Sequence, residues 1–117
     1  GKERFAGAID AVGGHTLANV LSQIAYDGVV AACGLAQSAE LPTTVMPFIL
    51  RGVTLAGVDS VKAPRPARER AWRLLSEKLD RTALAAITRT ARLDEIEALA
   101  PMLLDGKVRG RLVIDVA

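Results

Sequence analysis

Few residues of this chain have types and spacings that could do chemistry. The glycines never form the G-x-G-x-x-G pattern that lets a backbone approach the pyrophosphate of a dinucleotide. Gly52 and Gly57 have the spacing of the outer glycines of a phosphate-binding loop, but Val58 and Asp59 follow where lysine and serine or threonine would be needed. The sequence therefore predicts no phosphate-binding loop in this segment.

Histidine and cysteine each occur once, as His15 and Cys33. Zinc sites use several such ligands, so we expect no metal site of ordinary composition. His15 lies in a predicted turn with no nucleophile-elbow sequence near it, which argues against a Ser-His-Asp triad. The single cysteine excludes an internal disulfide and indicates a reducing compartment. We interpret Cys33 as a small buried apolar residue, and we expect no self-sufficient active site.

Composition narrows the class of protein. The 117 residues are enough for one domain with a modest core. Hydrophobic residues make up 50% of the chain and nearly all are aliphatic, which suits strands packed against helices. No apolar run is long enough to span a bilayer and no signal peptide precedes the first predicted strand. We therefore expect a soluble, cytoplasmic protein without a membrane partner.

The net charge of +2 is too small to indicate a nucleic-acid partner. The basic residues nevertheless cluster around two prolines, where acidic residues interrupt them and no aromatic ladder accompanies them. The basic members of this cluster are Lys62, Arg65, Arg68, Arg70 and Arg73. We favour a solvated linker and helix face, with a polyanion-binding surface as the alternative.

Two apolar segments with a helix between them predict a β-α-β unit. Residues 5–12 form a nearly continuous apolar run, as expected for a strand buried on both faces of a parallel sheet. Apolar residues then recur at helical spacing over residues 17–24, with Thr16 as the predicted cap. Residues 26–28 predict a turn and residues 29–33 a second buried strand, so the crossover should be right-handed.

A short helix and a third strand follow. Threonine at the front and proline in the first turn favour a helix over residues 43–50, which Arg51 and Gly52 would end. Residues 53–58 predict a third buried strand, with Ser60 just beyond it. Alternating strands and helices in this order predict an α/β fold with a doubly wound parallel sheet.

The pattern changes after the third strand. Two prolines at residues 64 and 66 indicate a stiff connector, and a helix is predicted over residues 67–79. Residues 83–93 are ambiguous and predict one or two short extended pieces.

The C-terminal part predicts one more helix and strand. Asp94 and Glu97 have the spacing of a capping box at the start of the helix. Pro101 should kink this helix, because proline removes a backbone donor. Gly106 closes it, and residues 112–116 predict a final strand.

The first predicted strand has a pairing problem. It is apolar on both faces, as a central strand would be, yet nothing before it in this chain can pair with its outer edge. Either another chain covers that edge or a missing half of the sheet does, and we favour the second. Asp10 is expected to anchor a turn at the end of this strand, without a catalytic role.

Four segments resemble one family. They are Phe5–Gly14, Gly28–Ala36, Leu41–Gly52 and Gly57–Val61. Together they are similar to the medium-chain dehydrogenase/reductase superfamily, and within it to the zinc-free quinone-oxidoreductase-like branch that includes acryloyl-CoA reductases. The resemblance extends over almost the whole chain. Its specific part is Pro-Phe-Ile-Leu-Arg followed by Gly-Val-Asp-Ser, whereas the early Asp-x-Val-Gly is common in the wider superfamily.

The resemblance implies that this chain is a C-terminal fragment of a two-domain reductase. Residues 1–80 would be the C-terminal half of a Rossmann NADP-binding domain, without its glycine-rich turn. Residues 81–117 would return toward an absent GroES-like catalytic domain. By the resemblance, NADPH in the intact protein passes hydride to the β-carbon of an enoyl thioester or to a quinone-like acceptor, and no metal takes part. The fragment alone is expected to be inactive.

The resemblance also implies which residues of this half meet the nicotinamide end of the cofactor, and it assigns none of them a catalytic role. Gly34 and Leu35 would form an apolar wall, and Ser60 would hydrogen-bond the cofactor or simply cap a turn. Main-chain groups at Ile49 would meet the carboxamide, unless Ile49 is a packed core residue. Gly106 matches a loop that approaches the cofactor in relatives, but it is also a plain helix stop.

The resemblance further implies a homodimer in which the edge strand Val53–Val58 pairs with its twofold mate, and the alternating residue types of this strand suit such an edge. A different class remains open on the sequence. The chain would then be a complete, non-enzymatic α/β module that binds a ligand or dimerises. A glycine-rich turn after a strand, encoded upstream in the parent gene, would distinguish the reductase from this alternative.

Overall fold

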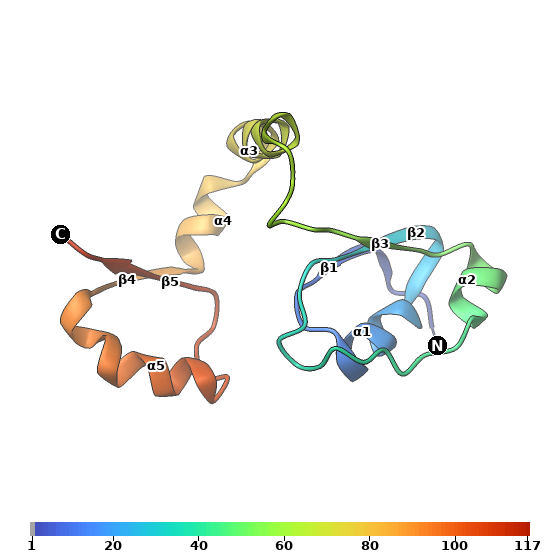
Figure 1. Cartoon of the computed structure of the whole chain (residues 1–117), viewed down its shortest axis with the longest axis horizontal. Helices are drawn as coiled ribbons and strands as arrows, with labels where there is room; N and C mark the ends of the chain where they lie inside the picture. Colours follow the sequence, from blue (N-terminus) through green and yellow to red (C-terminus); the bar gives the residue numbers. More distant parts are fainter. Residues whose placement is uncertain (1) are drawn as a thin grey trace. The chain divides into compact units, whose positions relative to one another are not determined.

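The computed structural model describes residues 2–117, which form two compact units, the first ending at Pro64 and the second running from Arg65 to Ala117. The first unit contains β1 (Phe5–Asp10), α1 (Gly14–Leu21), β2 (Ile24–Ala32), α2 (Met46–Arg51) and β3 (Thr54–Gly57) (Figure 1). The second contains α3 (Arg65–Lys78), α4 (Arg81–Ala86), β4 (Thr88–Arg92), the 3-10 turn η1 (Leu93–Glu95), α5 (Ile96–Leu104) and β5 (Arg111–Asp115).

The sheet of the first unit is wholly parallel and has the order β1-β2-β3. Asp10 pairs with Ala32, and Ala32 pairs with Gly57, so the three strands finish level with one another. This arrangement confirms the predicted α/β class with a parallel sheet. The outer two strands are shorter than predicted, because β1 ends at Asp10 and β3 starts at Thr54.

One face of this sheet is packed and the opposite face is open in the described residues. Alternate side chains of the strands meet α1 in a single core, with Phe48 of α2 packed against it. The buried members of this core are Leu17, Leu21, Ile24, Val30 and Val53. Ile9 points to the opposite face and is 85% exposed. The prediction that the first strand is buried on both faces is therefore wrong for this chain, because the helices of the first unit cover only one face.

The predicted turn at residues 26–28 is instead an irregularity within β2. Phe5 pairs with Ile24 and Gly7 pairs with Val29, so β2 carries extra residues between these two pairs. Such a bulge bends a strand without ending it. Ile24 consequently belongs to the strand, and its place in the predicted helix is wrong.

Glycines set the ends of the helices in the first unit. Gly13 is the N-cap of α1 with a φ of 69°, whereas Thr16, the predicted cap, lies inside the helix. Gly52 follows α2 with a φ of 61°, as predicted for a helix stop. Glycine adopts this left-handed conformation without the steric penalty of other residues.

The second unit has a parallel sheet of its own, in which β4 pairs with β5. Residues 83–93, predicted as extended pieces, contain the end of α4 as well as β4. Asp80 explains the helix, because its carboxylate accepts hydrogen bonds from the backbone N–H groups of Thr82 (2.9 Å) and Ala83 (3.0 Å). The prediction of extended structure before residue 87 is therefore wrong.

The capping interaction before α5 lies two residues earlier than predicted. Glu95 Oε2 accepts from the backbone N–H of Arg92 at 2.7 Å, which is one half of a capping box, and the predicted pair Asp94 and Glu97 is not used. Asp94 instead accepts from the guanidinium of Arg92, at 3.0 Å from both Nε and Nη2. This hydrogen bond, together with the charge of Glu95, raises the pKa of Arg92.

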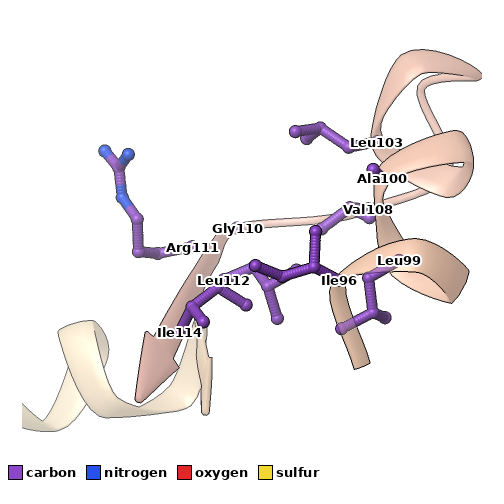
Figure 2. Close-up of a pocket in the computed structure, with 9 residues that line it drawn as sticks. All are labelled: Ile96, Leu99, Ala100, Leu103, Val108, Gly110, Arg111, Leu112 and Ile114. Carbon is purple, nitrogen blue, oxygen red and sulfur yellow. The ribbon is translucent and has the colours of Figure 1, made fainter. Parts of the chain in front are cut away.

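An apolar hollow of about 290 Å³ lies between α5 and β5 (Figure 2). It is lined by Ile96, Leu99, Ala100, Leu103, Val108, Gly110, Arg111, Leu112 and Ile114. Figure 2 shows that the guanidinium of Arg111 points away from the apolar side chains. Part of the apolar face of α5 and part of the apolar face of β5 therefore remain uncovered in this hollow.

Candidate functional site

The carboxyl ends of β1, β2 and β3 lie at one edge of the first sheet, because the strands are parallel and in register. Three short segments continue from this edge, namely residues 11–14, 33–38 and 58–61. In open α/β sheets, ligands bind in the crevice outside the carboxyl ends of the strands. We call this edge, with its three segments, the carboxyl edge.

Asp10 organises the first segment of the carboxyl edge. Its carboxylate is 5% exposed, and Oδ2 accepts from the backbone N–H groups of Gly13 (2.8 Å) and Val12 (3.2 Å). A buried carboxylate needs such donors, because an unpaired charge is costly away from water. The expectation that Asp10 anchors a turn is thus met by geometry, and its carboxylate is committed to that turn.

Backbone hydrogen bonds join the second segment, residues 33–38, to the end of β1 and the first segment. Cys33 N–H donates to the carbonyl of Asp10 (2.8 Å), and Ala36 N–H donates to that of Ala11 (3.2 Å). The carbonyl of Val12 accepts from the next two N–H groups, at 2.8 Å from residue 37 and 3.2 Å from residue 38. The turn that Asp10 stabilises therefore also positions the second segment where it leaves the sheet.

Two glycines allow these segments to approach each other closely. A Cβ built on Gly34 would overlap the carbonyl oxygen of Ala11, and one built on Gly13 would overlap the carbonyl oxygen of Ser38. Gly13 and Ser38 also form an isolated parallel bridge. Larger side chains at Gly13 or Gly34 would push the two segments apart.

Gln37 adds a contact that sequence reasoning missed. Its Oε1 accepts from the backbone N–H of Thr16 at 3.0 Å, and the carbonyl of Glu40 accepts from Gly14 N–H at 3.0 Å. These bonds join the segment after β2 to the first turn of α1. Gln37 and Thr16 are 21 positions apart in the sequence, so no local pattern indicates the pair.

Three of the predicted cofactor residues lie along the carboxyl edge. Gly34 and Leu35 lie two and three residues beyond the end of β2, and Leu35 is 65% exposed. Ser60 follows β3, in a turn where Asp59 Oδ1 accepts from the N–H groups of Val61 (3.0 Å) and Lys62 (3.1 Å). An exposed leucine beside a glycine offers an apolar surface with accessible backbone to a ligand.

The other two predicted residues lie elsewhere. Ile49 is exposed on α2, whose C-terminal Arg51 donates from Nη2 to the carbonyls of Leu21 (3.3 Å) and Ser22 (3.1 Å). These carbonyls end α1, just before β2 begins, so α2 lies toward the amino ends of the strands (Figure 1). Gly106 belongs to the second unit, where it follows α5 with a φ of 68°.

Cys33 is exposed, which contradicts the prediction of a buried residue. It directly follows β2 at the carboxyl edge, where its thiol donates to the carbonyl of Asp10 at 3.4 Å. Within residues 2–117, no group of three or more His, Cys, Asp or Glu side chains is placed to hold a metal ion. Over the same residues, no helix is both long and apolar enough to cross a membrane.

The carboxyl edge is suited to binding and orienting a ligand. Leu35 supplies apolar contact area, Gly34 lets the second segment pack closely against Ala11, and the carboxylate of Asp10 is already committed to the turn.

No family model matches the chain. Acrylyl-CoA reductase AcuI from Ruegeria pomeroyi is 49% identical to it over 114 residues, which are 97% of this chain and 34% of the reductase. The chain thus spans about a third of the length of this curated relative.

Two solved structures resemble the chain along nearly its whole length. The YhdH oxidoreductase from Salmonella enterica, in complex with NADP, has 44% identity and a TM-score of 0.86, covering 100% of this chain and 36% of that one. YhfP from Bacillus subtilis, with NAD bound, has 40% identity and a TM-score of 0.81, covering 99% and 36%. The chain therefore belongs to the medium-chain dehydrogenase/reductase superfamily, in the branch that contains acrylyl-CoA reductase AcuI and the quinone-oxidoreductase-like YhfP.

Proposed function

We propose that this chain is part of an NADPH-dependent reductase that reduces the conjugated C=C bond of an acryloyl-CoA-like enoyl thioester. The observation that carries the proposal is 49% identity to an acrylyl-CoA reductase along 97% of the chain. The carboxyl edge supports it, because its exposed Leu35 offers an apolar surface that suits the flat face of a nicotinamide ring. A quinone is the alternative acceptor.

In this proposal the chain binds and orients the cofactor, while catalytic groups come from elsewhere in the protein. Bound NADPH would supply a hydride to the β-carbon, a proton would join the α-carbon, and the products would be the saturated thioester and NADP⁺. Leu35 would pack on one face of the ring and keep water from it. The backbone at Gly34 and Ser60 would fix the ring position, which is the main contribution a protein makes to hydride transfer.

We retain Ile49 and Gly106 as proposed contacts with different support. Ile49 is exposed, as a ligand contact requires, but it lies on α2, toward the amino ends of the strands. Gly106 has open space where a Cβ would point, so a ligand could approach its backbone. The proposed domain division puts residues 1–80 in the cofactor domain and residues 81–117 in the return to a catalytic domain.

We also propose that the protein forms a homodimer through the edge strand at residues 53–58. β3 is the outer strand of the described sheet, so one row of its backbone groups faces away from β2. Val58 N–H donates to the carbonyl of Ala32 on β2 at 2.9 Å. Successive N–H groups of a strand point to opposite sides, so Gly57 N–H points outward, where a second copy can pair with it.

The test of this function is an assay of the natural polypeptide that contains this segment. NADPH consumption is followed with acryloyl-CoA, with a simple quinone and with no acceptor, and each reaction is repeated with NADH. Acceptor-dependent oxidation that is faster with acryloyl-CoA and NADPH is the expected result. Faster turnover of the quinone would replace the proposed substrate, and no turnover with either acceptor would refute the reductase assignment.

A further inference from the structure

Gln37 is the one side chain from the segment after β2 that is seen to hydrogen-bond the first turn of α1 in the described residues. Helix α1 has no side-chain cap of its own, because its N-cap is Gly13. Oε1 of Gln37 accepts the N–H of Thr16 at 3.0 Å and so satisfies one of the free donors of that turn. The cap of α1 is therefore supplied from the loop that carries Leu35.

The side chain of Gln37 is also held by packing. A Cβ built on Gly14 would lie 2.7 Å from Oε1 and 3.2 Å from Cδ of Gln37, so the amide rests directly on the backbone of Gly14. A second hydrogen bond between this loop and α1 runs from the N–H of Gly14 to the carbonyl of Glu40. Gln37 thus closes a link between α1 and the loop, two residues after Leu35.

We propose that Gln37 is a positioning residue for the carboxyl edge. Backbone hydrogen bonds hold the segment of Gly34 and Leu35 beside residues 10–12, and the side chain of Gln37 adds a link from this segment to α1. With both in place, these residues meet the nicotinamide end of NADPH without first being ordered. This inference rests on the proposed function. Gln37 acts through the loop and makes no contact with reacting atoms.

The hydrogen bond between Gln37 and Thr16 sets the size of the change in NADPH affinity that we expect when it is lost. Without it, the backbone bonds of the loop remain but the loop moves more freely relative to α1, and ordering it when the cofactor binds weakens binding. One neutral hydrogen bond corresponds to about a fivefold change in a binding constant. Because the bond is exposed, its loss should leave the fold intact.

The test measures NADPH binding by fluorescence in the natural polypeptide that contains this segment, as wild type, Gln37→Ala and Gln37→Glu. Gln23→Ala is the matched control, because Gln23 also makes one exposed side-chain hydrogen bond on α1, donating from Nε2 to the carbonyl of Asn19 at 3.1 Å. We expect Gln37→Ala to raise the Kd for NADPH about fivefold with kcat at saturating NADPH unchanged. Gln37→Glu, which keeps the acceptor oxygen, should restore most of the affinity.

A second measurement, on the chain itself, separates the two proposals. Amide hydrogen exchange at Thr16 and residues 34–36 should accelerate in Gln37→Ala and not in Gln23→Ala. An unchanged Kd in Gln37→Ala, or an equal loss in Gln23→Ala, would overturn the positioning role while leaving the proposed function standing. Failure of the wild type to bind NADPH would instead overturn the proposed function, and this inference with it.

Discussion

Two aspartates of the first unit make the same hydrogen-bonding pattern in different surroundings. Asp10 accepts from the N–H groups two and three residues ahead, and Asp59 does the same at the end of β3. Asp10 is 5% exposed whereas Asp59 is exposed to solvent. A donor left without a partner costs free energy only where water cannot replace the lost acceptor. Because the two aspartates share one hydrogen-bonding pattern and differ in exposure, comparing them isolates the effect of burial on stability.

Replacing Asp10 by alanine should therefore destabilise the chain, and replacing Asp59 should not. We expect Asp10→Ala to lower the free energy of unfolding by about 2 kcal/mol, because it leaves backbone donors unpaired inside the turn. Asp59→Ala should change it by less than about 0.5 kcal/mol. Urea unfolding of both variants measures the difference, and equal losses would show that burial of Asp10 has no energetic role.

Leu35 and Ile49 offer a direct comparison of the proposed cofactor contacts. Both are exposed aliphatic residues, at 65% and 72%, but only Leu35 lies in a segment of the carboxyl edge. Truncating a leucine that packs on a ligand removes apolar contact worth about 1 to 2 kcal/mol, or about tenfold in binding. We expect Leu35→Ala to raise the Kd for NADPH about tenfold and Ile49→Ala to change it less than threefold, measured in the natural polypeptide. The reverse order would move the cofactor site toward α2.

The residues that sequence reasoning found are those with local partners. The role of Asp10 could be predicted because its partners are two and three positions away, a spacing that any turn-forming aspartate can use. Gln37 could not, because its partner Thr16 becomes a neighbour only after β1 and β2 pair. The exposure of Cys33 was missed for a similar reason, since an apolar run does not reveal where its strand leaves the core.

At the scale of elements, the hydrophobic pattern predicted the order of strands and helices in the first unit, and the departures have local causes. β2 continues through Asp27, which takes a φ of 59°, so a residue that suggests a turn is accommodated in a bulge. Asp80 starts a helix that the apolar pattern alone did not suggest. Short amphipathic segments give only weak periodic signals in the sequence. Capping residues such as Asp80 therefore determine whether such a segment forms a helix.

Glycines at the ends of β2 and β3 differ in the space around them, which gives a second matched pair. A Cβ at Gly34 would overlap the carbonyl oxygen of Ala11, whereas a Cβ at Gly57 would meet nothing within 4 Å. We expect Gly34→Ala to destabilise the chain by about 1 to 3 kcal/mol through forced separation of the two segments. Gly57→Ala should be neutral or slightly stabilising, because alanine restricts the unfolded chain. Thermal unfolding of both variants tests this, and equal stability would mean that the segments separate without cost.

At the scale of the whole molecule, the first sheet has an uncovered apolar face and unpaired outer edges in the described residues. Ile9 is exposed on the open face, and the outer edges of β1 and β3 have no strand beside them in the described residues. The sequence predicted the edge problem, because a strand apolar on both faces implied cover from elsewhere. It could not specify which surface provides that cover, since this depends on residues outside the strand itself.

The proposed dimer has a test at the edge of β3. Proline at position 57 removes the outward N–H, and its Cβ would meet nothing within 4 Å. We expect the natural polypeptide to sediment as a dimer, Gly57→Pro to raise its dimer dissociation constant at least tenfold, and Gly57→Ala to leave it unchanged. A Gly57→Pro variant that dimerises like the wild type would place the interface elsewhere.

We propose above all that the protein to which this chain belongs transfers hydride from NADPH to a conjugated thioester. The most direct measurement uses NADPH carrying deuterium at both positions of nicotinamide C4, acryloyl-CoA, and mass spectrometry of the product. The natural polypeptide should yield propanoyl-CoA with one deuterium on the β-carbon, and the 117-residue chain alone should yield none. Unlabelled propanoyl-CoA, or no reduction by the natural polypeptide, would contradict the account.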